Sequence, residues 1–448
     1  YIYPELVPTP MLSFAVRRLS CSSGVIITAS HNPAKYNGYK CYDPEGYQMT
    51  DAAAAAAYEF IQKVDIFEDV KRMDFEKGLS EGVIEYISEE ISEEFFSAVS
   101  SKVINPDVCK NTDLKIIYTP LNGTGNKPVR KILDRLGIKN VKVVKQQELP
   151  DGNFPTCPYP NPEIRQAFEC AIEMAKTEPA DLLLATDPDC DRMGIAVYDG
   201  KDYKLMTGNE VGALFTEYVL SQYKEKGIMP KNPVVIKSFV TTDLVRVIAN
   251  DYGAKVADLL TGFKYIGEYI TNLERKGQES DFIIGMEESY GYLLGIHARD
   301  KDAVVASQLV CEMAAYYKSN GKTLIDVMNE IYGKYGIYLN RVDSFEFDGA
   351  AGMQKMADIM ASLRTSTFGE IGGLAVLEKT DYKDTEKTGL PSSNVISFKL
   401  DGGNGVVVRP SGTEPKIKIY ITSVSKTFEA AEAQYKNILN DSKKWLED

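Results

Sequence analysis

Apolar residues along this chain fall into short runs and into longer stretches with helical spacing, and the two kinds of segment alternate. Short apolar runs bounded by turn-forming residues predict buried strands. The predicted strands are residues 25–27, 38–42, 114–118, 141–145, 181–185, 234–238, 254–258, 282–286, 341–347, 405–408 and 417–422. Apolar residues that recur every three to four positions predict helices. The predicted helices are residues 11–19, 92–103, 127–136, 164–176, 209–226, 304–320, 324–335 and 349–363, with further helices that begin at 51, at 242 and after 264.

Strand–helix–strand order occurs twice, within residues 114–145 and within residues 234–286. This order is typical of a parallel α/β layer, because parallel strands need a crossover connection between them. Beyond residue 339 the strands lie closer together, which predicts a final α+β region. The chain is therefore expected to be a multi-domain α/β protein.

Composition narrows the functional classes. The 448 residues are 44% hydrophobic, enough for several cores and about two to four domains. A net charge of −13 argues against a nucleic-acid or anionic-membrane partner. No apolar run is long enough to span a membrane. The seven widely spaced cysteines, without a CxxC pair, indicate free thiols in a reducing cytoplasm.

The stretch Thr-Ala-Ser-His-Asn-Pro at residues 28–33 follows the first predicted strand. Small and polar residues closed by Asn-Pro predict a stiff turn at the strand tip. Ser30 would lie on that turn, where a hydroxyl can accept and donate a transferred group, and His31 can assist or orient it. A solvated turn without function is the alternative for such a Ser-His pair.

An acidic loop, Asp-Pro-Asp-Cys-Asp-Arg at residues 187–192, follows another predicted strand. The carboxylates of Asp187, Asp189 and Asp191 can converge if the chain turns tightly. Hard oxygen ligands of this kind suit Mg²⁺. An EF-hand would need Gly at loop position six and Glu at position twelve, where this chain has Arg192 and Tyr198. An acidic surface turn is the remaining alternative.

Two further loops carry candidate binding groups. Residues 285–291 read Gly-Met-Glu-Glu-Ser-Tyr-Gly, where carboxylates and a hydroxyl can hold vicinal sugar hydroxyls. Residues 409–416 read Arg-Pro-Ser-Gly-Thr-Glu-Pro-Lys between two predicted strands, and backbone N–H groups, hydroxyls and an arginine there can bind an anion. Each loop taken alone could be an ordinary surface loop.

Taken together and in this order, the four stretches resemble the signatures of the α-D-phosphohexomutases, the phosphoglucomutase/phosphomannomutase family. The resemblance spans residues 7–422. It implies that Ser30 carries a phosphoryl group and that Asp187, Asp189 and Asp191 bind Mg²⁺, with a phosphoryl oxygen on Ser30 completing the site. It also implies that Glu287 and Ser289 hold the sugar 3- and 4-hydroxyls. The other residues implied at the site are Arg192, Lys264, His297, Arg299 and Lys301, and, around the non-reacting phosphate, Arg409, Ser411, Gly412 and Thr413.

The reaction implied by the resemblance moves a phosphoryl group between C1 and C6 of a hexose phosphate through glucose 1,6-bisphosphate or its analogue. Lys40 is the candidate general acid/base, if nearby Arg and Mg²⁺ lower its pKa. His31 and His297 are alternatives for that role. The partners expected are small hexose phosphates, with no nucleic acid and no membrane.

Residues 36–40 and 287–292 are most similar to the longer bacterial phosphoglucomutases, so glucose 1-phosphate and glucose 6-phosphate are the expected pair. Mannose or pentose phosphates remain alternatives. Two other classes stay open: a phosphosugar-binding protein without catalysis, and a phosphatase that passes the phosphoryl group from Ser30 to water.

The domain organisation implied by the resemblance is three related α/β mixed-sheet domains and a C-terminal α+β domain around a central cleft. Residues 1–105 would carry the phosphoserine loop, with the N-terminal part of the family's domain missing. The domains expected to follow are residues 106–227 for metal binding, residues 228–338 for sugar binding and residues 339–448 for phosphate binding. We expect a monomer or weak homodimer.

Overall fold

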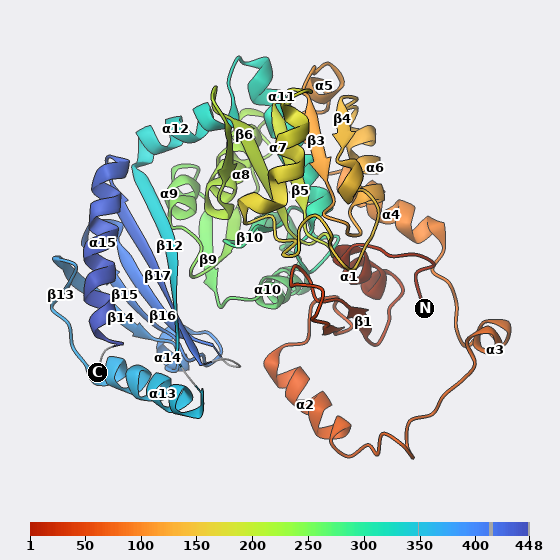
Figure 1. Cartoon of the computed structure of the whole chain (residues 1–448), viewed down its shortest axis with the longest axis horizontal. Helices are drawn as coiled ribbons and strands as arrows, with labels where there is room; N and C mark the ends of the chain where they lie inside the picture. The colour runs from red at the N-terminus through yellow and green to blue at the C-terminus, as the bar shows by residue number, and fades with distance from the viewer. Residues whose placement is uncertain (348, 412–414, 447–448) are drawn as a thin grey trace. The chain divides into compact units, whose positions relative to one another are not determined.

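The computed structural model describes residues 1–347, 349–411 and 415–446 (Figure 1). The chain forms two compact units, each built from two stretches of sequence. Unit 1 consists of Tyr1–Lys237 and Gly262–Ile325, and unit 2 of Ser238–Thr261 and Asp326–Asp448. Three of the four candidate loops therefore belong to unit 1.

The first strands of unit 1 form a small antiparallel sheet of β1 (Gly24–Ile27) and β2 (Tyr39–Tyr42). Helix α1 (Thr9–Arg18) packs against β1. The expectation that residues 25–27 are a buried strand is right about the strand and wrong about its burial, because Val25 is 44% and Ile27 60% exposed. Val25 and Ile27 alternate along β1 and so lie on one face of this sheet, which is open to solvent.

The second sheet of unit 1 has five strands in the order β4-β3-β5-β6-β7. Its strands are β3 (Ile116–Thr119), β4 (Val141–Val143), β5 (Leu182–Thr186), β6 (Met193–Tyr198) and β7 (Tyr203–Met206). The pairs β3–β4 and β3–β5 are parallel, as the strand–helix–strand order predicts. The pairs β5–β6 and β6–β7 are antiparallel, which makes the sheet mixed. The acidic loop is the connection between β5 and β6.

A third group of strands in unit 1 positions the sugar-loop candidate. Strand β10 (Phe282–Glu287) pairs in parallel with β8 (Val234–Ser238) and antiparallel with β11 (Gly291–Leu293). Helix α11 (Ala303–Ser319) is buried on all sides from Ala303 to Ala315, as expected for a helix in the centre of a large core. It contacts β5 and β6, which flank the acidic loop, and β11, which follows the sugar-loop candidate.

Unit 2 contains a six-stranded antiparallel sheet in the order β12-β17-β16-β15-β14-β13. Its strands are β12 (Ile337–Glu346), β13 (Glu370–Ile371), β14 (Leu374–Asp381), β15 (Ile396–Leu400), β16 (Gly405–Pro410) and β17 (Lys416–Ser425). Helices α13 (Gly349–Thr365) and α15 (Phe428–Lys444) pack on this sheet. The α+β character expected beyond residue 339 is confirmed.

The remaining elements complete both units. They are α2 (Asp51–Ile61), α3 (Phe75–Ser80), α4 (Glu89–Ser100), α5 (Pro106–Lys110), α6 (Asn126–Leu136), α7 (Glu169–Ala175), α8 (Gly208–Glu225), α9 (Leu244–Asp251), β9 (Lys255–Leu259), α10 (Phe263–Arg275), α12 (Leu324–Tyr335) and α14 (Thr385–Thr388). Short 3₁₀ turns lie at Lys145–Gln147, Arg165–Phe168, Glu279–Asp281 and Asp401–Gly403. Within the described residues, no helix is long and apolar enough to cross a membrane.

Candidate active site

The Ser30 loop leaves the end of β1 and returns to the start of β2. The backbone N–H of Thr28 donates to the carbonyl of Gly38 at 3.0 Å and closes the loop. Ser30 has a φ of +55°, a left-handed conformation that is uncommon for a residue other than glycine. Its N–H donates to the hydroxyl of Thr28 at 2.9 Å, and its Oγ lies 3.2 Å from Nδ1 of His31. The predicted stiff turn is therefore present, with the serine hydroxyl beside an imidazole.

The imidazole of His31 is neutral at neutral pH. Burial, as the largest cause, and the positive charge of Arg192 together lower its pKa to about 4. Asp189 and Asp191 act on the same pKa in the opposite direction. These charges belong to the acidic loop, so the Ser30 loop and the acidic loop are electrostatic neighbours. A neutral ring at 3.2 Å can accept a proton from the Ser30 hydroxyl or orient it.

The acidic loop brings its three carboxylates together, as the sequence predicts. Asp187, Asp189 and Asp191 are at most 3% exposed, and one carboxylate oxygen from each lies within 4.8 Å of the others. The tight turn relies on Cys190, which has a φ of +52°. Oδ1 of Asp187 accepts the backbone N–H groups of Asp191 at 3.1 Å and Arg192 at 2.9 Å.

The buried oxygens of this cluster fit a cation. Among the described residues, Oδ2 of Asp187, Oδ1 of Asp189 and Oδ1 of Asp191 have no hydrogen-bond partner. Buried carboxylate oxygens without partners are costly unless charge is supplied to them. Burial and the adjacent carboxylates of Asp189 and Asp191 raise the pKa of Asp187, which is a further sign of uncompensated negative charge. The triad can therefore hold a metal ion.

Two lysines supply part of the missing positive charge. Nζ of Lys40 lies 2.8 Å from Oδ2 of Asp189 and 3.5 Å from Oδ2 of Asp191, and Nζ of Lys301 lies 3.2 Å from the same Asp191 oxygen. Burial alone raises the pKa of Asp191, but the charges of Lys301, Lys40 and Arg192 outweigh it and lower that pKa. Lys40 belongs to β2, so it joins the Ser30 hairpin to the acidic loop.

The role of Lys40 as general acid/base, which depends on a pKa lowered by nearby Arg and Mg²⁺, stays a prediction. Burial acts in that direction, but the carboxylates of Asp189 and Asp191 outweigh it and raise the pKa. The Lys40 side chain is therefore protonated and positively charged at neutral pH. The same balance of burial against Asp191 and Asp300 raises the pKa of Lys301.

Arg192 links the acidic loop to the sugar-loop candidate. Its Nη1 donates to Oε1 of Glu163 at 2.9 Å and to the carbonyl of Ser289 at 3.1 Å. Glu287 accepts the N–H of Gly262 at 2.6 Å. Burial raises the pKa of Glu287, while the charges of Lys301 and Arg192 oppose that rise. The structure thus brings Arg192, Glu287, Ser289 and Lys301 together near the aspartates.

Three other predicted site residues are held by protein partners. Lys264 donates to Asp51 at 2.5 Å. His297 lies 2.7 Å from Asp302 and packs edge-on against the ring of Phe95, so it supports the start of α11. In the part of the chain that the structure describes, neither these two side chains nor Arg299 forms a hydrogen bond or ion pair with the aspartate triad. Their binding roles stay predictions.

Arg299 is fully buried and has several partners. Its guanidinium donates to Thr271 at 3.0 Å, to Glu274 at 2.7 Å and to the carbonyl oxygens of Ile296 and Ala298. Glu274 also accepts from Arg17 of α1 at 2.6 Å. This network stabilises the contact between α1 and α10.

The anion-loop candidate lies in unit 2. Arg409 is in β16, in register with Lys418 of β17. The N–H of Ser411 donates to the carbonyl of Lys416 at 2.7 Å, which closes the turn between the two strands. Gly412 and Thr413 lie outside the described residues. The phosphate-binding role of all four residues stays a prediction.

Two contacts of this site are not predicted by any pattern in the sequence. The N–H of Thr9, at the start of α1, donates to the carbonyl of Asp189 at 2.9 Å, and its hydroxyl lies 3.4 Å from Oδ2 of the same aspartate. The second is the ion pair of Glu163 with Arg192. The Thr-Pro pair at residues 9–10 marks a helix start, which gives no indication that it also holds the acidic loop.

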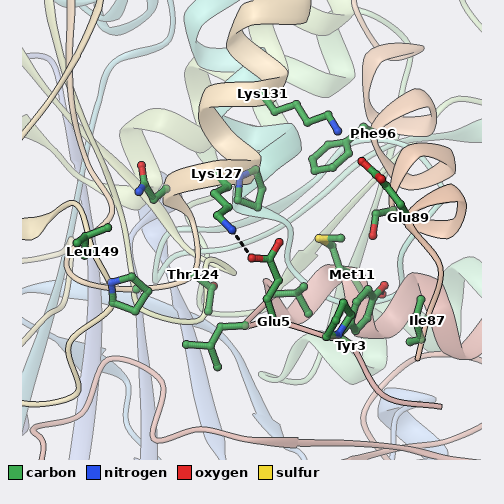
Figure 2. Close-up of a pocket in the computed structure, with 18 residues that line it drawn as sticks. Tyr3, Glu5, Met11, Ile87, Glu89, Phe96, Thr124, Lys127, Lys131 and Leu149 are labelled. Carbon is green, nitrogen blue, oxygen red and sulfur yellow. Dashed lines mark hydrogen bonds and ion pairs between the residues drawn. The ribbon is translucent and has the colours of Figure 1, made fainter. Parts of the chain in front are cut away.

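A cavity of about 680 Å³ has none of the candidate site residues in its lining (Figure 2). It is lined by the N-terminal segment, α4 and the start of α6, and Lys127 reaches across to Glu5 (Figure 2). On one wall, the N–H of Thr124 donates to the carbonyl of Pro188 at 2.8 Å. A lining residue therefore contacts the acidic loop, although none of the three aspartates lines the cavity.

Comparison with known proteins agrees with this geometry. Models of phosphoglucomutase/phosphomannomutase α/β/α domains I, II and III match residues 1–66, 93–200 and 207–335. The phosphoglucomutase of Staphylococcus saprophyticus is 36% identical over 444 residues, which covers 96% of this chain and 79% of the relative. The chain belongs to the phosphoglucomutase/phosphomannomutase family. The phosphoglucomutase of Staphylococcus aureus strain MSSA476 is 35% identical over 96% of this chain and 77% of its own length.

Solved structures of this family share the fold. The exocytosis-sensitive phosphoprotein pp63/parafusin from Paramecium superposes with a TM-score of 0.70 at 19% identity, covering 99% of this chain and 80% of that one. The N-acetylphosphoglucosamine mutase of Aspergillus fumigatus gives a TM-score of 0.56 at 15% identity, covering 99% and 97%. The predicted α/β fold is thus confirmed, and the family identifies the chain as a mutase. The domain boundaries expected at residues 106 and 228 stay predictions, since the family matches begin at 93 and 207.

Proposed function

We propose that this mutase interconverts glucose 1-phosphate and glucose 6-phosphate through a phosphoryl group carried on Ser30. The relatives that are about 35% identical to it are phosphoglucomutases. One observation carries the assignment of the site: Lys40, ten residues after Ser30, pairs with Asp189 and Asp191. An ion pair thereby joins the hairpin that carries Ser30 to the acidic loop, although the two are far apart in the sequence.

The chemistry of this site is a transfer between two hydroxyl oxygens. The oxygen of the free sugar hydroxyl forms a bond to phosphorus and loses its proton to a base. The bond between phosphorus and Oγ of Ser30 breaks, and Oγ gains a proton, which leaves glucose 1,6-bisphosphate and free serine. The other phosphoryl group then returns to Ser30. Phosphoryl transfer needs positioning and positive charge more than covalent chemistry. Lys40, Lys301 and Arg192 supply that charge at the transferring group.

Proton transfer at Ser30 has two candidates in this geometry. Lys40 is a cation, which suits it to donate a proton to Oγ as the phosphoryl group leaves. His31 is neutral and 3.2 Å from Oγ, so it can accept a proton without first losing one. His297, the third candidate, is engaged with Asp302. Lys40 and His31 are therefore the pair to test.

We propose Mg²⁺ as the cation of the aspartate triad. Carboxylate oxygens without hydrogen-bond partners favour a hard divalent ion, and the Aspergillus mutase was solved with GlcNAc-6P and magnesium. When bound, the ion would neutralise charge on the transferring phosphoryl group. Glu287 and Ser289 would hold the sugar, and Arg409, Ser411, Gly412 and Thr413 would hold the phosphate that does not react.

We also propose a cytoplasmic monomer or weak homodimer with no nucleic-acid or membrane partner. The seven cysteines are free thiols, as expected in a reducing compartment. The four domains proposed are residues 1–105, 106–227, 228–338 and 339–448. Light scattering on a sizing column would test the oligomeric state.

The deciding experiment is a coupled assay of glucose 6-phosphate formation from glucose 1-phosphate, with Mg²⁺ and a trace of glucose 1,6-bisphosphate. Turnover that needs both additions is expected for the wild type. Ser30→Ala should abolish it and retain the fold, while Ser22→Ala, an exposed serine nearby, should not change it. Turnover by Ser30→Ala would disprove the phosphoserine mechanism.

Parallel assays separate the alternatives. Mannose 1-phosphate and ribose 1-phosphate, each with its own coupling system, rank the sugars. Release of inorganic phosphate in place of isomerisation would identify a phosphatase. Binding of glucose 1-phosphate without turnover would identify a phosphosugar-binding protein.

A further inference from the structure

Asp300 has a carboxylate that is fully occupied by donors, although the reaction described above does not use it. Its Oδ2 accepts the hydroxyl of Tyr42 at 2.5 Å and the side-chain amide of Gln48 at 3.0 Å. Its Oδ1 accepts the backbone N–H of Lys301 at 2.8 Å and lies 3.4 Å from Nζ of Lys301. We call Tyr42, Gln48 and Asp300 the Asp300 clamp.

Two of the three clamp residues are buried and Gln48 is half-buried, and the clamp joins the two segments that carry the site lysines. Tyr42 and Asp300 are 0% and 1% exposed. Tyr42 lies two residues after Lys40 in β2, and Asp300 directly precedes Lys301. The clamp therefore ties the strand that carries one site lysine to the segment that carries the other. A hydrogen bond between buried groups of which one is charged is stronger than an average one.

The geometry around Lys301 shows what the clamp fixes. Its ammonium group lies between Oδ1 of Asp300 at 3.4 Å and Oδ2 of Asp191 at 3.2 Å. Lys40 reaches that same Asp191 oxygen at 3.5 Å. A free lysine side chain has many rotamers, and holding one of them in place costs entropy. A carboxylate locked by Tyr42 and Gln48 restricts the ammonium group without moving itself.

We propose that Tyr42, Gln48 and Asp300 are positioning residues that set the place of the Lys301 ammonium group for phosphoryl transfer. This inference rests on the proposed function, because it assigns a task within that site. An ammonium group held where charge develops stabilises the transition state more than the bound substrate. Loss of the clamp should therefore lower kcat and leave KM nearly unchanged.

A purely structural role is the alternative, and a matched tyrosine separates the two. The hydroxyl of Tyr203 donates to the carbonyl of Ala180 at 2.7 Å in a buried setting of the same unit, with no contact to the site. The Tyr203 hydroxyl also accepts the N–H of Ala180 at 3.1 Å, so removing it costs two buried hydrogen bonds, whereas removing the Tyr42 hydroxyl costs one. Only Tyr42→Phe should affect catalysis.

The test compares Asp300→Asn, Asp300→Glu, Tyr42→Phe and Tyr203→Phe in the full chain, measuring kcat, KM and the melting temperature of each. Asp300→Asn should lower kcat by about 10- to 100-fold, the effect of losing one hydrogen bond to a charged group. Tyr42→Phe should lower kcat by about 3- to 10-fold, and Asp300→Glu should recover part of the loss. Tyr203→Phe should lower the melting temperature and leave kcat and KM unchanged.

Each result decides the proposal. A kcat of Tyr42→Phe equal to that of Tyr203→Phe overturns it, as does a rise in KM with kcat retained. If Asp300→Asn fails to fold, the Tyr42→Phe comparison decides alone. If the wild type shows no turnover, the proposed function is wrong. A crystal structure of Tyr42→Phe then tests the positioning role of the clamp on its own, and a Lys301 ammonium group in the same place as in the wild type would contradict that role.

Discussion

His31 combines two properties that seldom occur together, a place beside a reactive hydroxyl and a ring that stays neutral well below neutral pH. Its pKa falls from the usual 6.5 to about 4 because burial and Arg192 both disfavour the imidazolium. A proton donor at that position would need the opposite shift. The residue therefore suits proton acceptance or orientation of Ser30.

This shift makes stability depend on pH. Between pH 6.5 and about 4 the unfolded chain binds a proton at His31 that the folded chain does not, so stability should fall as pH falls through this window. His31→Gln removes the titrating group. We expect urea unfolding at pH 7 and about pH 4.5 to show a smaller loss of stability in His31→Gln than in the wild type. An equal loss in both proteins would show that His31 is not held neutral.

Individual residues also show where sequence reasoning stops. The aspartate triad could be predicted because its three carboxylates lie within five consecutive residues, so one turn brings them together. The contacts of Thr9, Glu163 and Tyr42 could not, because their partners are far away in the sequence. The same holds for the effect of Asp189 and Asp191 on the pKa of Lys40, because only the folded chain brings these aspartates close to it.

At the scale of elements, α2 (Asp51–Ile61) is the least anchored helix of unit 1, since no residue within it is buried. Its anchor in the described structure is Asp51, which accepts from Lys264 at 2.5 Å and from Tyr265 at 3.2 Å. The alanine run has high helix propensity, but an isolated helix of this length is marginal in water. Local opening should therefore occur here before it occurs in the core.

Limited trypsin digestion should cut first after Lys63, Lys71 or Arg72, on the exposed stretch that follows α2. Asp51→Ala should speed this cleavage, because it removes the anchor, whereas Asp107→Ala in α5 should leave the rate unchanged. Mass spectrometry of the first fragments gives the measurement. A first cut within α6 would contradict the assignment of α2 as the weakest element.

Helices were predicted from the sequence more closely than sheets. The prediction of a helix at residues 127–136 differs from α6 (Asn126–Leu136) by one residue, because periodicity and the following glycine mark both ends. The antiparallel strands β6 and β7 were not predicted, since strand order depends on pairing and not on local pattern. Burial of β1 was overestimated because an apolar run does not reveal how many neighbours a strand has.

At the scale of the whole molecule, a cation at the triad would link catalysis to stability. A ligand that binds only the folded state stabilises it by about 2.7 kcal/mol at a concentration one hundred times its Kd. We expect Mg²⁺ to raise the melting temperature and a chelator to abolish turnover reversibly. Asp189→Asn should lose most of the rise in melting temperature, while Asp134→Asn, on the exposed side of α6, should keep it.

The melting experiment with Mg²⁺ also has an outcome that would contradict the aspartate triad as the cation site. An Asp189→Asn protein that gains as much melting temperature from Mg²⁺ as the wild type would place the cation elsewhere. The two lysines at the cluster make a further point: because Lys40 and Lys301 already neutralise part of the acidic charge, the chain should fold with the chelator present.

The left-handed backbone of Ser30 sets a trade-off for anyone who engineers this enzyme. Glycine adopts that conformation without the cost of order 1–3 kcal/mol that a side chain carries there. Selection for heat resistance alone would thus favour Ser30→Gly, which makes the protein more stable but removes the serine that is proposed to carry the phosphoryl group. Thermostability screens of this chain need an activity filter, since this stabilising change would remove the residue on which the proposed catalysis depends.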